Sequence, residues 1–152
     1  MSRLSAALPA LERAIGWLNT SGHLLDLAIR LYVAEVFFRS GLLKIGNWDG
    51  TLYLFANEYR VPLLPAEAAA WLGTFGELAF PPLLALGLAA RFAALSLTVF
   101  NIVAVLSFWH VLKGNEAALM SHFYWGTLLL VTLCHGPGKL SLDHLLRKRL
   151  AG

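Results

Sequence analysis

The sequence contains little charge, a single cysteine and none of the common signatures of soluble enzymes. Charged residues make up 14% of its 152 residues, against roughly a quarter in a typical soluble chain. Its one cysteine, Cys134, excludes an internal disulfide and indicates no cellular compartment. A P-loop, a dinucleotide-binding glycine fingerprint, a serine nucleophile elbow and a C-x-x-C-H haem attachment motif are all absent from it. The sequence therefore gives no basis for soluble-enzyme chemistry and has no evident haem or flavin motif.

Hydrophobic residues, by contrast, make up 58% of the chain, and the mean hydropathy is +0.65. A core of this size cannot hide so much apolar surface, so lipid must cover the rest. The net charge is +3, and the only basic cluster is Arg147, Lys148 and Arg149. Such a cluster beside apolar helices is more typical of the cytoplasmic side of a membrane than of nucleic-acid binding. We therefore expect an integral membrane protein that contacts a lipid bilayer and no nucleic acid.

Four apolar segments are each long enough to cross a bilayer, which takes about 20 residues of helix. They run over residues 24–45, 68–90, 92–112 and 118–135. The predicted fold is therefore all-α, a four-transmembrane-helix bundle with amphipathic N- and C-terminal segments. We expect three parts: an interfacial N-terminal segment over 1–23, the membrane domain over 24–138, and a basic cytoplasmic tail helix over 139–152.

Both ends of the chain show apolar residues at helical spacing. In the N-terminal segment these residues are Leu4, Leu8, Leu11, Ile15 and Leu18. We expect residues 3–18 to lie flat on the membrane surface, and Ser141 to cap a short tail helix after the sequence HGPGK. The loop over 46–67 has turn signals and aromatic residues suited to the lipid–water interface. Placing both termini in the cytoplasm puts seven basic residues inside and three outside, which the positive-inside rule favours.

The first apolar segment contains four ionisable residues, Asp26, Arg30, Glu35 and Arg39. On a helix, Asp26 lies near Arg30 and Glu35 lies near Arg39, and the two pairs occupy nearly opposite faces. A charge near the bilayer centre costs roughly 2.5–3.5 kcal/mol. One pair must therefore face the other helices, while the second must lie near a headgroup layer or another subunit. We expect Arg30 to be buried, because Arg39 is close enough to the end of the span to snorkel.

Glu77 lies near the middle of the second apolar segment, one turn before Pro81 and Pro82. The two prolines have no N–H, so the carbonyls four residues before them lose their helical partners and form a polar spot with the carboxyl group. Asn101, at similar depth in the third segment, is positioned to hydrogen-bond there. Two roles for Glu77 remain open. It forms a buried ion pair with Arg30 that fixes helix order, or it accepts a proton or binds a ligand.

His110 and His122 flank the short loop between the third and fourth segments, on the predicted outer side. Their imidazoles form a candidate metal pair, or a route for protons to a quinone. His135 falls on the opposite side and is expected to cap the fourth helix. Glu77 and His110 are the candidate catalytic residues. The candidate cofactor-binding residues of the polar intramembrane site are Arg30, Glu77, Asn101 and His110.

The stretch RLYVAEVFFRSGLLKIGNW resembles the first helix of DoxX-family membrane proteins, which carries an arginine, a phenylalanine, a glycine and a lysine at fixed intervals. Further on, YRVPLLP, ELAFPPLLALGLAARFAAL and FWH resemble the family's proline-bearing loop, second-helix glutamate, glycine-then-arginine hairpin and third-helix histidine. These features fall on Arg30, Phe37, Gly41, Lys44, Pro62, Glu77, Gly87, Arg91 and His110. The closing SHFYWGTLLLVTLCHGPGKLSLDHLL is also similar to DoxX-like tails, so the resemblance covers about residues 24 to 146.

The resemblance implies a four-helix, multi-pass protein of the bacterial inner membrane. Some relatives are a subunit of a thiosulfate:quinone oxidoreductase, and others accompany redox or stress-defence proteins. It thus implies a small membrane subunit of such a system, with a quinone as cofactor and a redox protein or a second copy as partner. Glu35, Arg39 and the two prolines after Glu77 depart from the family pattern. The alternative is a non-enzymatic membrane assembly component, or a small-solute or metal transport component, with structural buried ion pairs.

Overall fold

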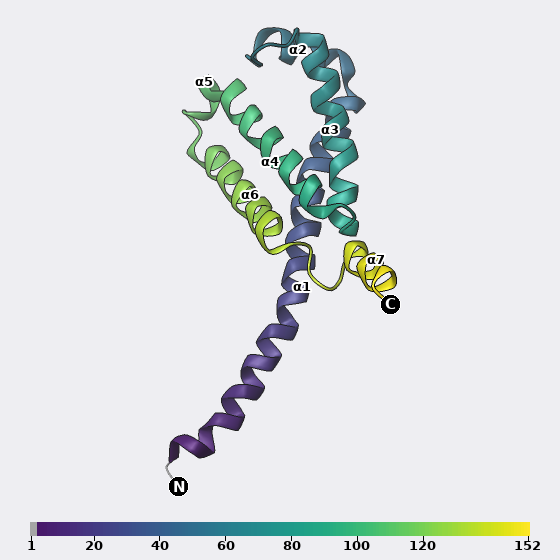
Figure 1. Ribbon diagram of the computed structural model, residues 1–152. Helices are drawn as coiled ribbons and strands as arrows, with labels where there is room; N and C mark the ends of the chain where they lie inside the picture. The colour runs from purple at the N-terminus through teal and green to yellow at the C-terminus, as the bar shows by residue number, and fades with distance from the viewer. Residues whose placement is uncertain (1–2) are drawn as a thin grey trace.

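The computed structural model describes residues 3–152, and the part of the chain it describes is all-α, as predicted. Nothing is described of the side chains of residues 3–8, 10, 14 and 19. The helices are α1 (Arg3–Gly46), α2 (Trp48–Asn57), α3 (Ala66–Leu86), α4 (Ala90–Ser107), α5 (Trp109–Leu112), α6 (Glu116–His135) and α7 (Leu142–Leu150). In Figure 1, α2 and α5 lie at one end of the bundle, and α7 and the N-terminal half of α1 lie at the other.

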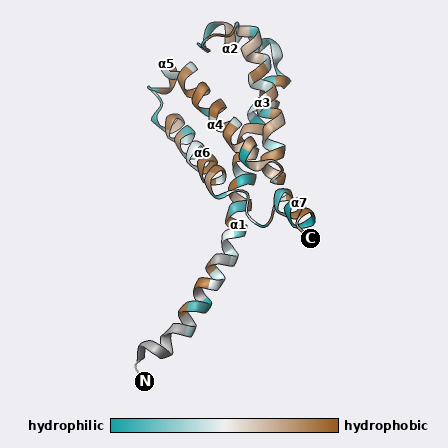
Figure 2. Ribbon diagram, viewed as in Figure 1, coloured by the Kyte–Doolittle hydropathy of each residue, from teal (hydrophilic) through white to brown (hydrophobic). Residues whose placement is uncertain are grey.

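The bundle consists of the C-terminal half of α1 together with α3, α4 and α6. Each packs on the next, α1 on α3, α3 on α4 and α4 on α6, and α6 returns to contact α1. Within the described residues, α3, α4 and α6 are long and apolar enough to cross a membrane, and the long helix α1 accompanies them. Figure 2 shows hydrophobic residues along these helices. The chain is therefore a multi-pass membrane protein with the predicted four-helix core.

Helix α1 contains 44 residues, which makes it about 66 Å long at 1.5 Å per residue. The predicted first span, 24–45, is its C-terminal half, and no break separates this half from the N-terminal segment predicted over 1–23. The N-terminal half extends away from the bundle (Figure 1), with Leu11, Ile15 and Leu18 exposed. Leu4 and Leu8, which complete the predicted apolar stripe, have side chains outside the described part of the chain.

The predicted loop over 46–67 contains helix α2. Asn47 starts it, accepting a hydrogen bond from the Gly50 backbone N–H through its side-chain oxygen. Of the aromatic residues in this stretch, Phe55 is buried against Ala69 and Ala70 of α3, with Tyr59 at the edge of this small core, whereas Tyr53 is exposed. Aromatic packing thus holds α2 on the end of α3.

The predicted third span, 92–112, is not one helix. It is broken at Phe108 into α4 and α5, and the carbonyl of Ser107 accepts a hydrogen bond from the Arg60 backbone N–H at 2.9 Å. Because an N–H from the loop after α2 satisfies that carbonyl, the chain can turn without leaving a polar group unpaired. The break places Phe108 and His110 beside the α2 end of the bundle.

The tail helix α7 docks against the turn between α3 and α4. Ser141 caps it as predicted, accepting a hydrogen bond from the His144 N–H. The Asp143 carboxylate in turn accepts hydrogen bonds from the Ala89 and Ala90 N–H groups, at 2.8 and 2.9 Å, at the start of α4. A carboxylate at a helix N-terminus is favoured by the unpaired N–H groups there. This contact fixes the C-terminal tail to the bundle.

Candidate functional site

Glu77 on α3 forms an ion pair with Lys44 on α1, and the Glu77 Oε2 to Lys44 Nζ distance is 2.6 Å. Lys44 Nζ also donates a hydrogen bond to Ser40 Oγ at 2.8 Å. The Lys44 and Glu77 side chains are only 18% and 14% exposed. The helices come close at this point because Gly41 faces α3, where an added Cβ would lie 2.9 Å from the Leu78 side chain.

The predicted ion pair between Glu77 and Arg30 is therefore wrong. Arg30 and Lys44 lie about 21 Å apart along α1 at 1.5 Å per residue, and the packing of α1 on α3 brings Lys44, and not Arg30, to the depth of Glu77. Arg30 instead reaches the far end of α3, where it donates to the carbonyls of Leu84 and Ala85. The polar intramembrane site predicted from Arg30, Glu77, Asn101 and His110 thus does not form as a single cluster.

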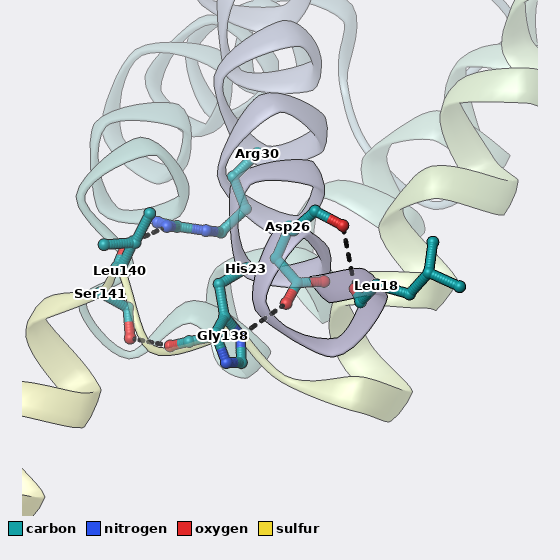
Figure 3. Close-up of polar contacts among 8 residues, drawn as sticks. Leu18, His23, Asp26, Arg30, Gly138, Leu140 and Ser141 are labelled. Atoms are coloured by element: carbon teal, nitrogen blue, oxygen red, sulfur yellow. Dashed lines mark hydrogen bonds and ion pairs between the residues drawn. The ribbon is translucent and has the colours of Figure 1, made fainter. Parts of the chain in front are cut away.

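Arg30 is fully buried and makes hydrogen bonds to two other parts of the chain. Its Nη1 donates to Leu84 O at 3.2 Å and Ala85 O at 2.8 Å, and its Nη2 donates to Leu140 O in the segment before α7. Figure 3 shows the guanidinium reaching toward Leu140, with Asp26 and His23 on the neighbouring turn of α1. A cation is favoured beside the unpaired carbonyls at a helix C-terminus. Arg30 therefore joins α1, α3 and the tail.

Arg91 makes a similar contact to α6. Its Nη2 donates to Cys134 O at 3.1 Å, near the C-terminus of that helix. His135, which was predicted to cap the same helix end, lies beside Arg91 among the residues of a small surface pocket. Both arginines thus stabilise helix ends far from Glu77.

A cavity of about 330 Å³ opens beside the Lys44–Glu77 pair, between α1, α3, α4 and α6. The aromatic residues that line it are Phe37, Tyr59, Phe100, Phe108 and Trp125, and the polar or charged ones are Arg39, Ser40, Lys44, Glu77 and His122. Arg39 is 76% exposed, so the cavity reaches the outer surface of the bundle. It combines ring surfaces with a cation, a carboxylate and an imidazole.

His122 is held in one orientation by Asn101. The Asn101 amide Nδ2 donates to His122 O at 2.9 Å, and its Oδ1 lies 2.8 Å from His122 Nδ1. Because the amide nitrogen is identified by the first bond, Oδ1 is an acceptor and Nδ1 carries the proton in the neutral ring. The remaining nitrogen, Nε2, is then a free acceptor. Asn101 thus orients the imidazole that lines the cavity and does not contact Glu77.

Tyr59, in the loop after α2, is stacked between two rings. Its ring centroid lies 4.7 Å from that of Phe55 and 4.9 Å from that of Phe108. Burial, and secondly the negative charge of Glu77, raise the pKa of the Tyr59 phenol above its ordinary value of 10.0. The phenol is therefore neutral at physiological pH, and Tyr59 is one of the residues that line the cavity.

His110 lies outside this cavity. Its Nε2 is 3.5 Å from Glu58 Oε2, and its ring contacts Phe108 edge-on. Among residues 3–152, no three histidine, cysteine, aspartate or glutamate side chains gather in a group that could hold a metal ion. The metal pair predicted from His110 and His122 therefore has no third ligand of these types in the described chain.

Sequence reasoning found Glu77 and His122 but missed Lys44, Tyr59 and Trp125. Lys44 is one of the three basic residues predicted on the outer side and the lysine of the DoxX-like pattern, and Tyr59 is one of the aromatic residues of the 46–67 loop predicted to lie at the interface. The available signal for the ion pair was an acid within one apolar segment and a lysine near the end of the neighbouring segment. Trp125 had no signal, because an aromatic residue in an apolar helix is ordinarily part of the core.

A model of the DoxX family matches residues 25–110 of the chain. An uncharacterized protein of Haemophilus influenzae is 36% identical to it over 129 residues, which cover 80% of this chain and 83% of that protein. No solved structure matches the chain. The family match includes Lys44, Tyr59 and Glu77, and it ends before His122 and Trp125.

Proposed function

Because the chain belongs to the DoxX family of membrane proteins, we propose that it is a small membrane subunit of a redox system and binds a quinone head group in the cavity beside Glu77. The observation that carries the proposal is the composition of this cavity. Five aromatic rings line it, and its ionisable side chains are those of Arg39, Lys44, Tyr59, Glu77 and His122. Its volume of about 330 Å³ is at the small end of the ~300–1,000 Å³ typical of small-molecule sites. A single flat ring system fits this size and this lining.

Lys44 is the best placed donor to a carbonyl oxygen. An ammonium group has three N–H donors, and Lys44 uses one on Ser40 and one on Glu77. The third N–H is available to a ligand. In this proposal the Tyr59 phenol supplies a second donor, which is uncharged. The aromatic walls would hold a planar ring by stacking, with ring centroids about 4.5–7 Å apart.

In this proposal Glu77 and His122 are the groups that accept and pass on protons. The Glu77 carboxylate accepts from Lys44, and His122 presents Nε2 as a free acceptor once Nδ1 is engaged by Asn101. A bound quinone would supply two-electron, two-proton chemistry. Since the sequence has no flavin, haem or iron–sulfur motif, a partner protein supplies the electrons in this proposal. In this proposal the protein lies in a bacterial inner membrane with both termini on the cytoplasmic side, as the positive-inside rule favours. The cavity then lies toward the outer face.

A second function, membrane assembly or small-solute transport without redox chemistry, is favoured by one observation. The Lys44–Glu77 bond at 2.6 Å and the close approach at Gly41 join α1 to α3 directly, which is what a purely structural pair would do. Under this alternative the cavity would be part of a solute path or a packing gap.

The two functions are separated by binding measured on the full-length protein in lipid nanodiscs. Short-tailed ubiquinone and menaquinone analogues are titrated while tryptophan fluorescence is recorded, since a quinone in the cavity would quench Trp125. We expect saturable quenching that is lost in Trp125→Phe and retained in the matched control Trp109→Phe, because Trp109 does not line the cavity.

Substitution of Glu77 completes the test. Glu77→Gln at unchanged protein level, with loss of quinone-dependent redox activity in membranes, supports the redox role. Loss of the variant protein from the membrane, together with no saturable quenching in the wild type, supports the structural alternative. Equal quenching by Trp125→Phe and wild type would contradict binding in this cavity.

A further inference from the structure

One face of α1 carries a regular series of exposed side chains. Some of them share surface grooves with other elements, Leu24 with Leu140 and Phe38 with Pro81. The members of the series are Trp17, Ser21, Leu24, Ala28, Leu31, Glu35, Phe38, Leu42 and Ile45, and all of them are exposed. We call this set the α1 seam. The separations along it alternate strictly between four and three residues, which is the spacing of the a and d positions of a coiled coil. Such a spacing keeps one narrow stripe turned toward a single neighbouring helix.

The α1 seam carries a charge where lipid would otherwise lie. Glu35 is about 16 Å along the helix from Leu24 at 1.5 Å per residue, close to the centre of a hydrocarbon layer about 30 Å thick. Its carboxylate is 3.1 Å from Arg39, and the two side chains are 59% and 76% exposed. Among the described residues, each has only the other as an ion-pair partner. Lipid tails cannot satisfy the remaining lone pairs and N–H groups.

We propose that a second copy of this chain covers the α1 seam, forming a parallel dimer through α1. Copies inserted in the same orientation are related by a two-fold axis along the membrane normal, so the same patch faces itself. A patch that carries one acid and one base four residues apart is self-complementary, because Arg39 of each copy can bond the partner's Glu35. The four charges then sum to zero inside the interface.

The shape of this face agrees with a helix seated on it. A groove of about 240 Å³ runs beside Glu35 and is lined by Leu31, Ala34, Phe38, Pro81 and Pro82, among others. It lies where α1 meets α3, and the prolines of α3 form its other wall. Two helices that cross at about 20°, the usual left-handed angle of membrane bundles, would keep the α1 seam in contact over several turns.

Leu24 and Leu25 provide a matched pair for testing the proposal. Both are leucines at the same depth and both are 62% exposed, but only Leu24 lies on the seam. The exposed Cys134 is first replaced by serine, and Leu24→Cys or Leu25→Cys is added. Native membranes are then treated with a copper oxidant. We expect a disulfide-linked homodimer from Leu24→Cys and only a trace from Leu25→Cys. Leu42→Cys and Leu43→Cys repeat the comparison 18 residues nearer the other end of α1, again with only the first of the two on the seam.

The charge pair is tested in the Leu24→Cys background. Glu35→Lys should abolish the crosslink, because each copy then brings two positive charges to the interface, and the exchanged double variant Glu35→Lys/Arg39→Glu should restore it. Equal crosslinking at Leu24 and Leu25, the absence of any crosslink on the seam, or a crosslink to a different protein would each overturn the proposal. So would a full crosslink in Glu35→Lys alone. Restoration by the exchanged variant also shows that loss in the single variant is not a failure to fold.

Discussion

Glu77→Gln, Lys44→Met and the double variant measure how much the cavity's ion pair contributes to stability. Removing either partner leaves the other as an unpaired charge on an interface between α1 and α3. The double variant removes both charges and keeps side chains of similar length. The comparison therefore isolates the energy of the pair from the energy of packing around it.

The structure sets the expected magnitude. Breaking a buried ion pair from one side costs about 3–5 kcal/mol of unfolding free energy. Lys44 and Glu77 keep 18% and 14% of their exposure, and Lys44 retains its hydrogen bond to Ser40. We therefore expect each single substitution to cost about 2–3 kcal/mol, below the fully buried range. The double variant should be about 1.5–2 kcal/mol more stable than the sum of the two single effects predicts.

Unfolding of the full-length protein in lipid–detergent micelles, followed by far-UV circular dichroism during titration with a denaturing detergent, gives these free energies. Glu58→Gln serves as the control, because its partner His110 is 3.5 Å away and both side chains are substantially exposed; it should cost less than about 0.5 kcal/mol. Additive effects of Glu77→Gln and Lys44→Met, each no larger than that of the control, would refute the reasoning.

Three further predictions concern the ends of the bundle and the cavity rim. Arg30→Met should cost about 3 kcal/mol, because the carbonyls it binds at the end of α3 lose a buried cation, and limited proteolysis should then cleave the tail before α7 more rapidly than in the wild type. Gly87→Ala should cost about 2 kcal/mol or more, since its φ is +67° and an added Cβ would lie 2.5 Å from Ser141 Cβ. A melting temperature lowered by several degrees checks this, and an unchanged melting temperature contradicts it. For Tyr59, the raised pKa means that the folded protein holds the phenolic proton more tightly than the unfolded chain. Stability from the neutral phenol is present below pH 10 and is lost as pH rises through the raised pKa, so the melting temperature should fall above pH 10 in the wild type and less in Tyr59→Phe.

Much of the fold could be predicted from local pattern. Apolar segments of membrane-spanning length placed the helices α3, α4 and α6 within a few residues of their ends, and Ser141 was recognised as the cap of α7. The break at Phe108 could not be predicted, because it depends on a hydrogen bond from Arg60, nearly fifty residues earlier in the chain. The helix α2 was missed because its turn signals, Asn47 and Gly50, act as a helix cap instead of ending structure.

The candidate site was only half predictable. Glu77 stood out because an acid in an apolar helix is costly anywhere else, and His122 because it can titrate. Which residue neutralises Glu77 was assigned wrongly, since Arg30 and Lys44 lie on the same helix and local pattern does not distinguish between them. The pairing of His122 with Asn101 also requires α4 and α6 to be adjacent.

The sequence by itself determined that lipid is the solvent, that helices cross it, and that ionisable groups inside must find protein partners. These conclusions need only composition and helical spacing, which are local properties. The tertiary structure alone decided that Lys44 meets Glu77, that Arg30 clamps the opposite end, and that Glu35 and Arg39 face outward. Each of these depends on the register and rotation of α1 against α3, which are set by how complementary surfaces pack, at Gly41 and Leu78 for example, and not by the pattern of either helix alone.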